Sequence, residues 1–172
     1  MRAEGCYGEC VVKKSPSLKD AFLKGCLVTL GIVLLLAGLL LQQILILMVA
    51  AIYLYVFIAI LWQRFDVTYE YVFVDGQLDF DKIMGGNARK HIKRIDMDTV
   101  EIVAPENSHA LDGYQHLNLK PIDFSSTIRN EEHRVFAIIN KGVKETEKIL
   151  FEPNAELLSL MKSKSPRKIQ EF

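Results

Sequence analysis

The sequence predicts a membrane α-helical hairpin followed by a mainly-β domain that ends in a helix. Three observations support this fold class. Residues 25–63 contain no Asp, Glu, Lys or Arg, apolar residues then alternate with period two, and a final apolar stripe repeats at three and four residues. The 172 residues leave room for one ordinary domain beside a small apolar segment.

The uncharged run is too long for one crossing of a membrane. A single helix over it would measure close to 60 Å, about twice the hydrocarbon thickness of a bilayer. We therefore expect two helices at about 23–41 and 44–62, with Gln42 and Gln43 as the turn and Trp62 as an interfacial anchor. A re-entrant hairpin that stops short of the far face is the alternative, and both forms return the chain to the side from which it came.

The positions of the basic residues predict the orientation. Four lysines precede the first helix, one arginine follows the second, and the turn carries no charge. By the positive-inside rule, we expect a multi-pass protein of the cell (inner/plasma) membrane with both termini cytoplasmic. The part after residue 64 is mildly acidic, with fifteen Lys and Arg against eighteen Asp and Glu, which argues against nucleic acid as a partner.

The strands follow directly after the uncharged run. Residues 65–74 alternate apolar and polar side chains, Asp75-Gly76 is a strong hairpin signal, and 77–84 returns with its apolar face matched to the first strand. Further strands are expected at 88–95, 99–104, 122–126, 133–140 and 145–152.

A helix closes the predicted domain. Pro153 and Asn154 mark its start, and Leu157, Leu160 and Met161 form its apolar stripe. The expected organisation is a flexible N-terminal tail at 1–20, the hairpin at 21–64, the mainly-β domain at 65–163 and a basic tail at 164–172.

About seven strands in meander order before one helix form the element order of a pleckstrin-homology-like barrel, although small β-sandwiches share much of it. The chain resembles a family of small bacterial two-helix membrane proteins with a pleckstrin-homology-like cytoplasmic domain, a domain of unknown function. The resemblance rests on these segments: "ECVVKK" (9–14), "YEYVFVDGQLDFDKI" (69–83), "ARK" (88–90), "APENSHALDGY" (104–114), "DFSS" (123–126) and "FEPNAELLSLMKSKSPRK" (151–168). It implies a seven-stranded barrel with a C-terminal helix that binds partners or membranes rather than catalysing a reaction.

A very polar strand carries the densest basic cluster. Its side chains could contact anionic lipid headgroups together with basic residues beside the membrane helices. The candidate lipid contacts are Lys13, Lys14, Arg64, Lys90, Lys93 and Arg94. The alternative is a solvated edge strand whose charges prevent edge-to-edge pairing.

The stretch at 105–121 is long for a loop in a small domain, and long loops are commonly functional. We take it as the candidate surface for a protein partner. The candidate contacts are Asn107, Ser108, His109, Asp112 and Tyr114. Ser108, His109 and Asp112 are the residue types of a catalytic triad, but no nucleophile elbow or oxyanion signature accompanies them.

Two other groups of polar residues were considered as metal sites, and neither is expected to bind a metal. Cys6 and Cys10 lack two further ligands of a structural zinc site, so free thiols are expected. Asp79 and Asp81 share a face opposite Glu70, and a solvated acidic face is preferred there over a bridging cation.

The sequence therefore predicts a non-enzymatic interaction module that is anchored in the lipid bilayer and binds a membrane-proximal protein. No catalytic residue, metal or cofactor is expected. The first alternative is an anionic-lipid-binding or membrane-organising domain, and a remote alternative is a hydrolase. The partner's identity and the oligomeric state stay open.

Overall fold

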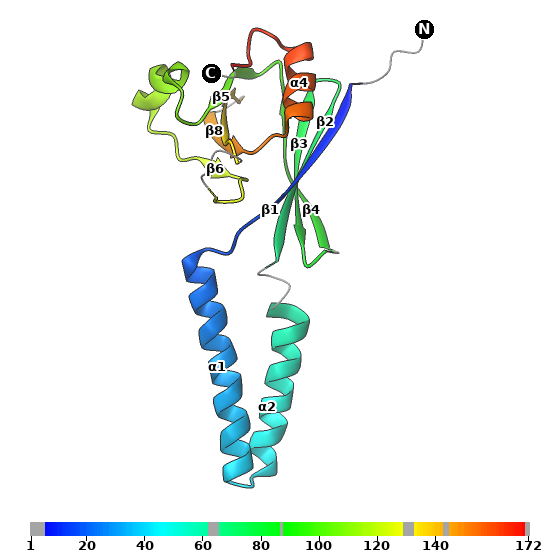
Figure 1. Ribbon diagram of the computed structural model, residues 1–172, viewed down its shortest axis with the longest axis vertical. Helices are drawn as coiled ribbons and strands as arrows, with labels where there is room; N and C mark the ends of the chain where they lie inside the picture. Colours follow the sequence, from blue (N-terminus) through cyan, green and yellow to red (C-terminus); the bar gives the residue numbers. More distant parts are fainter. Residues whose placement is uncertain (1–5, 62–65, 87, 129–132, 143–144, 171–172) are drawn as a thin grey trace. The chain divides into compact units, whose positions relative to one another are not determined.

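Two helices cover most of the uncharged run, α1 (Leu18–Leu40), which begins before it, and α2 (Ile44–Val56), and the chain continues from α2 as a π-helical turn, η1 (Phe57–Leu61) (Figure 1). This computed structural model describes residues 6–61, 66–86, 88–128, 133–142 and 145–170. The chain divides into two units, of which one comprises Ser15–Val67 with Met84–Ala88 and the other comprises the rest.

Helices α1 and α2 pack against each other at small residues. Gly38 is buried, and a Cβ atom there would lie 2.8 Å from Cδ2 and 3.2 Å from the backbone nitrogen of Leu47, so a larger residue would force Leu47 to shift. At the other end of the pair, the Tyr53 hydroxyl donates a hydrogen bond to the carbonyl oxygen of Leu27 at 2.6 Å. The tyrosine's polar tip is thus satisfied between two apolar helices.

Among the described residues, only α1 is long and apolar enough to cross a membrane. Helix α2 is 13 residues long, and its apolar helical stretch ends at Ala59, which is short of the roughly 20 residues of a full span. Gln42 takes a positive φ of 50° in the predicted turn. Trp62 and Arg64 lie outside the described residues.

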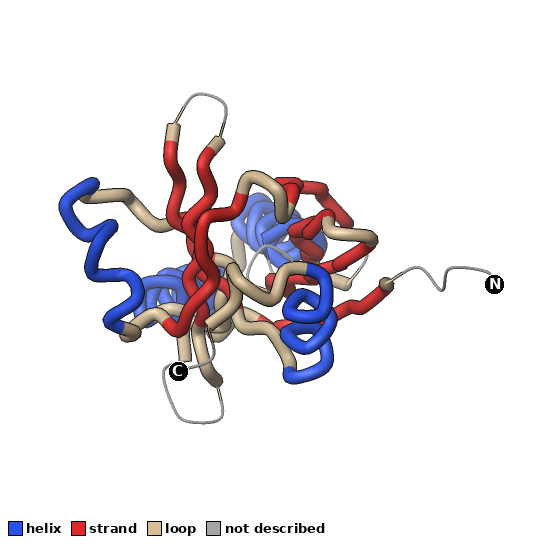
Figure 2. Tube along the Cα trace, turned by 90° about the horizontal axis from the view of Figure 1, so that it is seen from above, coloured by secondary structure: helices blue, strands red, loops and turns tan. Residues whose placement is uncertain are grey.

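The mainly-β unit contains two four-stranded sheets, which do not close into the seven-stranded barrel that we predicted (Figure 1 and Figure 2). Their orders are β1-β2-β3-β4 and β5-β7-β8-β6. The strands are β1 (Tyr7–Lys13), β2 (Val67–Val74), β3 (Gln77–Met84), β4 (Ala88–Asp96), β5 (Val100–Pro105), β6 (Ile122–Asp123), β7 (Phe136–Lys141) and β8 (Thr146–Phe151).

The prediction of a flexible tail over residues 1–20 was wrong, because Tyr7–Lys13 forms strand β1. It pairs antiparallel with β2 along its whole length, from Tyr7 opposite Val74 to Lys13 opposite Thr68. This pairing was difficult to predict because the partner strand follows only after both apolar helices. The helices are therefore an insertion in the connection between the first two strands of one sheet.

Strand β7 is buried on both faces, which explains its nearly continuous apolar sequence. It lies between β5 and β8 and pairs antiparallel with both. Strand β6, expected over 122–126, is only two residues long and pairs in parallel with β8.

Aromatic side chains from both sheets form the centre of the core. Tyr71 and Phe80 belong to the first sheet, Phe151 belongs to the second, and Phe124 follows β6. The rings of Phe80 and Phe124 stack at 4.7 Å between centroids, and Tyr71 meets Phe151 edge-on at 5.7 Å. The Tyr71 hydroxyl donates to the Phe124 carbonyl oxygen at 2.6 Å, so the only polar atom on these four side chains is paired.

Helix α4 (Ala155–Lys164) begins where the sequence predicts, since the Asn154 side chain accepts a hydrogen bond from the Leu157 amide at 2.7 Å. The segment that follows, which we predicted as a basic tail, makes backbone hydrogen bonds to the second sheet. The amide of Val103 donates to the Lys168 carbonyl at 2.7 Å, and the amide of Gln170 donates to the Val103 carbonyl at 2.8 Å. The segment thus pairs with the outer edge of β5.

Candidate binding pocket

The stretch predicted as a long loop contains a 3₁₀-helix, η2 (His109–Leu117), which covers one face of the second sheet. Ser108 caps its start, because the Ser108 hydroxyl accepts a hydrogen bond from the Ala110 amide at 3.3 Å. Asn118 ends it in the left-handed conformation at φ 45°. The sequence does carry a signal for this helix, because Ala110, Leu111, Tyr114 and Leu117 recur at three and four residues, but we interpreted the stretch as a loop.

The underside of η2 packs on an apolar cluster. Leu111 from η2 is buried there, and Tyr114 and Leu119 pack against its margin. The sheet contributes these buried residues: Ile102, Ala104, Val135, Ala137, Ile139 and Leu150. This contact fixes η2 on a rigid sheet, which is a suitable base for a binding surface.

A cavity of about 400 Å³ lies between η2 and the sheet. Its apolar floor consists of Leu111, Leu119 and Ile139, and the amide side chains of Asn107, Gln115 and Asn118 also line it. The charged and hydroxyl residues in its wall are Glu106, Ser108, Asp112, Tyr114 and Lys148.

Four of the five predicted partner contacts therefore line one cavity: Asn107, Ser108, Asp112 and Tyr114. His109 does not line it, because its side chain is fully exposed. His109 instead lines a neighbouring surface depression together with Asn107 and Gln170.

Asp112 is held at the rim of the cavity. Its carboxylate lies 3.1 Å from Nδ1 of His109 and accepts a hydrogen bond from Nε2 of Gln115 at 2.8 Å. The Asp112 side chain nevertheless remains 55% exposed, so its charge is available to solvent or to a ligand.

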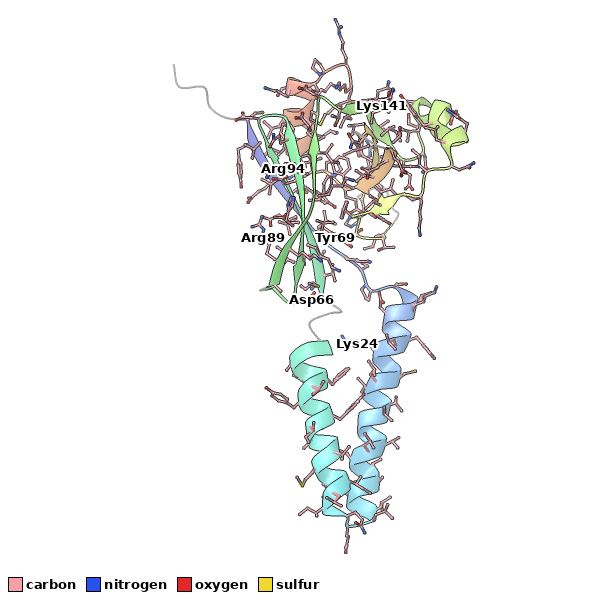
Figure 3. All side chains as sticks on the ribbon, turned by 180° about the vertical axis from the view of Figure 1, so that it is seen from behind. Lys24, Asp66, Tyr69, Arg89, Arg94 and Lys141 are labelled. Atoms are coloured by element: carbon pink, nitrogen blue, oxygen red, sulfur yellow. The ribbon has the colours of Figure 1, made fainter. Side chains whose placement is uncertain are left out.

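A charged network lies beside Tyr114 of η2. Nζ of Lys141 on β7 donates to the Glu101 carboxylate at 2.6 Å (Figure 3). Burial, followed by the charge of Glu101, raises the pKa of the Tyr114 phenol, and the Lys141 hydrogen bond lowers the pKa of Glu101. These groups keep Tyr114 against the sheet.

Lys148 is a pocket residue that our sequence analysis did not identify. In the β7–β8 ladder it pairs with Ile139, and Leu150 pairs with Ala137 two residues later. Alternate residues share a face of a strand, so Lys148 emerges on the apolar face that η2 covers. Its position inside a charged stretch, "KETEK", gave no sign of this burial.

The predicted lipid cluster on β4 is largely paired with carboxylates. Arg94 forms a bidentate pair with Asp79, at 2.6 and 2.8 Å (Figure 3). Nε of Arg89 donates to Asp81 at 2.7 Å, and Nδ1 of His91 lies 2.8 Å from the same carboxylate. The acidic face that we expected to be solvated is therefore covered by β4.

The other predicted lipid contacts are more scattered. Lys93 forms an ion pair with Glu147, Lys90 is exposed on β4, Lys13 ends β1, and Lys14 lies in the connection to α1. Because Lys93 and Arg94 already have acidic partners, less of their charge is available to a lipid surface.

A buried carboxylate that the sequence did not highlight ties the segment after β6 to the start of α4. Glu152 accepts hydrogen bonds from the amide and hydroxyl of Ser126, at 2.9 and 2.8 Å, and its second oxygen lies 3.4 Å from Nδ1 of His133. The thiol of Cys10 donates to the Glu152 carbonyl oxygen at 3.6 Å, and burial raises the pKa of that thiol.

The cysteines in the described residues, Cys6, Cys10 and Cys26, are free. No group of three or more His, Cys, Asp and Glu side chains that could hold a metal occurs in that part of the chain.

The comparisons with known proteins identify the family. Residues 4–171 match the family described as Bacterial PH-like domain (DUF6106), a domain of unknown function. No curated protein and no solved structure matches the chain. The match covers nearly the whole chain, helices included, and agrees with the two sheets and the C-terminal helix. The protein therefore belongs to the family of bacterial PH-like domains.

Proposed function

We propose that this protein is a membrane-anchored, non-enzymatic interaction module that holds its PH-like domain at the cytoplasmic face of the membrane and binds a membrane-proximal protein. PH-like domains generally bind proteins or lipids. The observation that carries the choice of a protein partner is the cavity beneath η2, whose wall combines an apolar floor, amides and charges of both signs. Such a wall offers a polypeptide apolar contact, hydrogen bonds and charge pairing, the interactions found at protein–protein interfaces.

The surface of α1 supports the membrane anchor. Its large apolar side chains point outward, and Ile32, Leu36 and Leu40 are 52%, 53% and 82% exposed. Apolar surface of this extent is unfavourable in water and favourable in hydrocarbon. We propose that α2 enters the same bilayer and that η1 extends its length.

The insertion of the helices in the β1–β2 connection supports a close tether. The chain reaches α1 from β1 within residues 14–17 and returns to β2 within residues 62–66. Two short connections, each at most about 3.5 Å per residue, limit how far these strand ends can move from the anchor. A domain tethered in this way has a raised effective concentration for partners at the same membrane.

The lipid-binding alternative is less well supported. Arg89 and Arg94 are engaged by Asp81 and Asp79, and the pKa of each guanidinium is raised, first of all by its hydrogen bond to that carboxylate. A partner surface at η2 needs no rearrangement of this network.

Site-specific photocrosslinking tests the proposal. A benzoylphenylalanine introduced at Gln115, on the rim of the cavity, should capture a defined protein from native membranes. The same residue at Ser159, on the exposed side of α4, is the matched control. A product at position 115 that is absent at position 159 supports the proposed function, whereas identical or empty patterns contradict it.

A further inference from the structure

Lys148 gives the cavity a preference for a ligand that carries a negative charge. It is half-buried and lies on a face whose other residues are mostly apolar. In the described part of the chain no ion pair involves Lys148, whereas Lys93 and Lys141 each have a carboxylate partner. A partly desolvated ammonium gains most from a negative charge that arrives with a ligand.

The cavity also presents two carboxylates, Glu106 in its wall and Asp112 at its rim. Asp112, fixed by His109 and Gln115 at the rim, keeps an exposed carboxylate, while Leu111 and Ile139 form an apolar floor. A simple anion would be attracted by Lys148 and repelled by Asp112. A ligand with both charges, separated by an apolar group, satisfies all three features.

We propose that the cavity binds a short segment of the partner in which an apolar side chain is flanked by an acidic and a basic one. The acidic group pairs with Lys148, the apolar group covers Leu111 and Ile139, and the basic group pairs with Asp112. This inference rests on the proposed function, because it specifies the partner's chemistry at the same site. The volume of about 400 Å³ lies within the range of small-ligand sites.

Short peptides test this preference on the full-length protein in nanodiscs. The probes are acetylated and amidated Lys-Leu-Glu and Glu-Leu-Lys, and the matched controls replace glutamate by glutamine. Ligand-observed NMR should show that at least one glutamate peptide binds about tenfold more tightly than its glutamine control. The difference should decrease at high salt.

Variants assign the effect to Lys148. Lys148→Gln and Lys148→Met, the second of which keeps an apolar stem, should remove the difference between the glutamate and glutamine peptides. Lys120→Gln makes the same change of charge at an exposed position near η2 and should preserve it. Circular dichroism should show that all three variants are folded.

Two outcomes overturn the inference: no measurable binding of either glutamate peptide, or a preference that persists in both Lys148 variants. If crosslinking at position 115 still captures a partner, only the preference is wrong. If that crosslinking also fails, the proposed function itself is wrong.

Discussion

Asp81 shows how single residues stabilise the first sheet. Burial alone would raise the pKa of its carboxyl group, but hydrogen bonds from Arg89 and His91 outweigh this and lower it. Because the pKa of Asp81 is lower in the folded than in the unfolded protein, its ionised carboxylate stabilises the fold above the unfolded pKa of about 4. This contribution is lost as the pH falls through the pKa of Asp81 in the folded protein. Acid should therefore weaken the β3–β4 pairing.

We expect Asp81→Asn to lower the free energy of unfolding by about 1 kcal/mol at pH 7, a modest value because its exposed partners are screened by water. The cost should shrink between pH 5 and pH 3, as measured by urea unfolding followed by circular dichroism. Asp98→Asn, on an exposed turn, is the control. An equal cost at both pH values would show that the charge of Asp81 is unimportant.

Glu152 should matter more, because its partners are buried. In Glu152→Ala the amide and hydroxyl of Ser126 lose their acceptor, and we expect a cost of about 2–3 kcal/mol in the free energy of unfolding. Glu152→Gln keeps one acceptor oxygen and should cost less. Glu156→Ala, an exposed change in α4, should cost no more than about 0.5 kcal/mol. Similar urea midpoints for all three variants would contradict this role.

For single residues, the sequence showed where charged side chains lie along the strands, but it did not show which acidic and basic side chains form ion pairs. It placed Asp79 and Asp81 on one face of a strand, and it found the basic residues of β4. Their pairing depends on the relative register of β3 and β4, which side-chain alternation alone does not determine. Lys148 was missed for a similar reason, since only the β7–β8 register places it opposite Ile139.

At the scale of elements, Gly8 tests the packing of α4 on β1. A Cβ atom at this position would lie 2.5 Å from Cδ1 of Leu160, so the leucine must move. We expect Gly8→Ala to lower the thermal midpoint of the domain by a few degrees, at a cost of about 1 kcal/mol. Leu160→Ala should make Gly8→Ala nearly neutral in a double-mutant cycle. Additive effects of the two changes would contradict the contact.

Elements with local signals were predictable. The β2–β3 hairpin, the β7–β8 hairpin and α4 lie close to their expected positions, because turn residues and an N-cap mark their ends. Strand β1 and the edge contact of Ile169 were missed, because both pair with residues far along the chain. The cavity depends on η2. The spacing of its apolar residues is helical, but this spacing alone does not determine the sheet face on which the helix packs.

At the scale of the whole molecule, the helical insertion within a sheet changes what a truncation would remove. Deleting the chain before residue 65 would take β1 together with the helices, and β2 would lose its antiparallel partner. We expect such a fragment to be destabilised and prone to aggregation through the exposed β2 edge, as measured by size-exclusion chromatography. A fragment in which residues 7–13 are retained and joined to β2 by a short linker should remain monomeric. A monomeric, stable 65–172 fragment would show that β1 is dispensable.

The proposed function requires that the apolar unit anchors the PH-like domain at the cytoplasmic face of the membrane. Thiol labelling of intact cells tests this requirement. The three native cysteines are first replaced by serine or alanine. Single cysteines are then placed at Gln43, in the turn between α1 and α2, and at Ser159, on the exposed side of α4. We expect an impermeant maleimide to label position 43 in intact cells and to label position 159 only after the membrane is opened. Labelling of position 159 in intact cells, with position 43 protected, would contradict it.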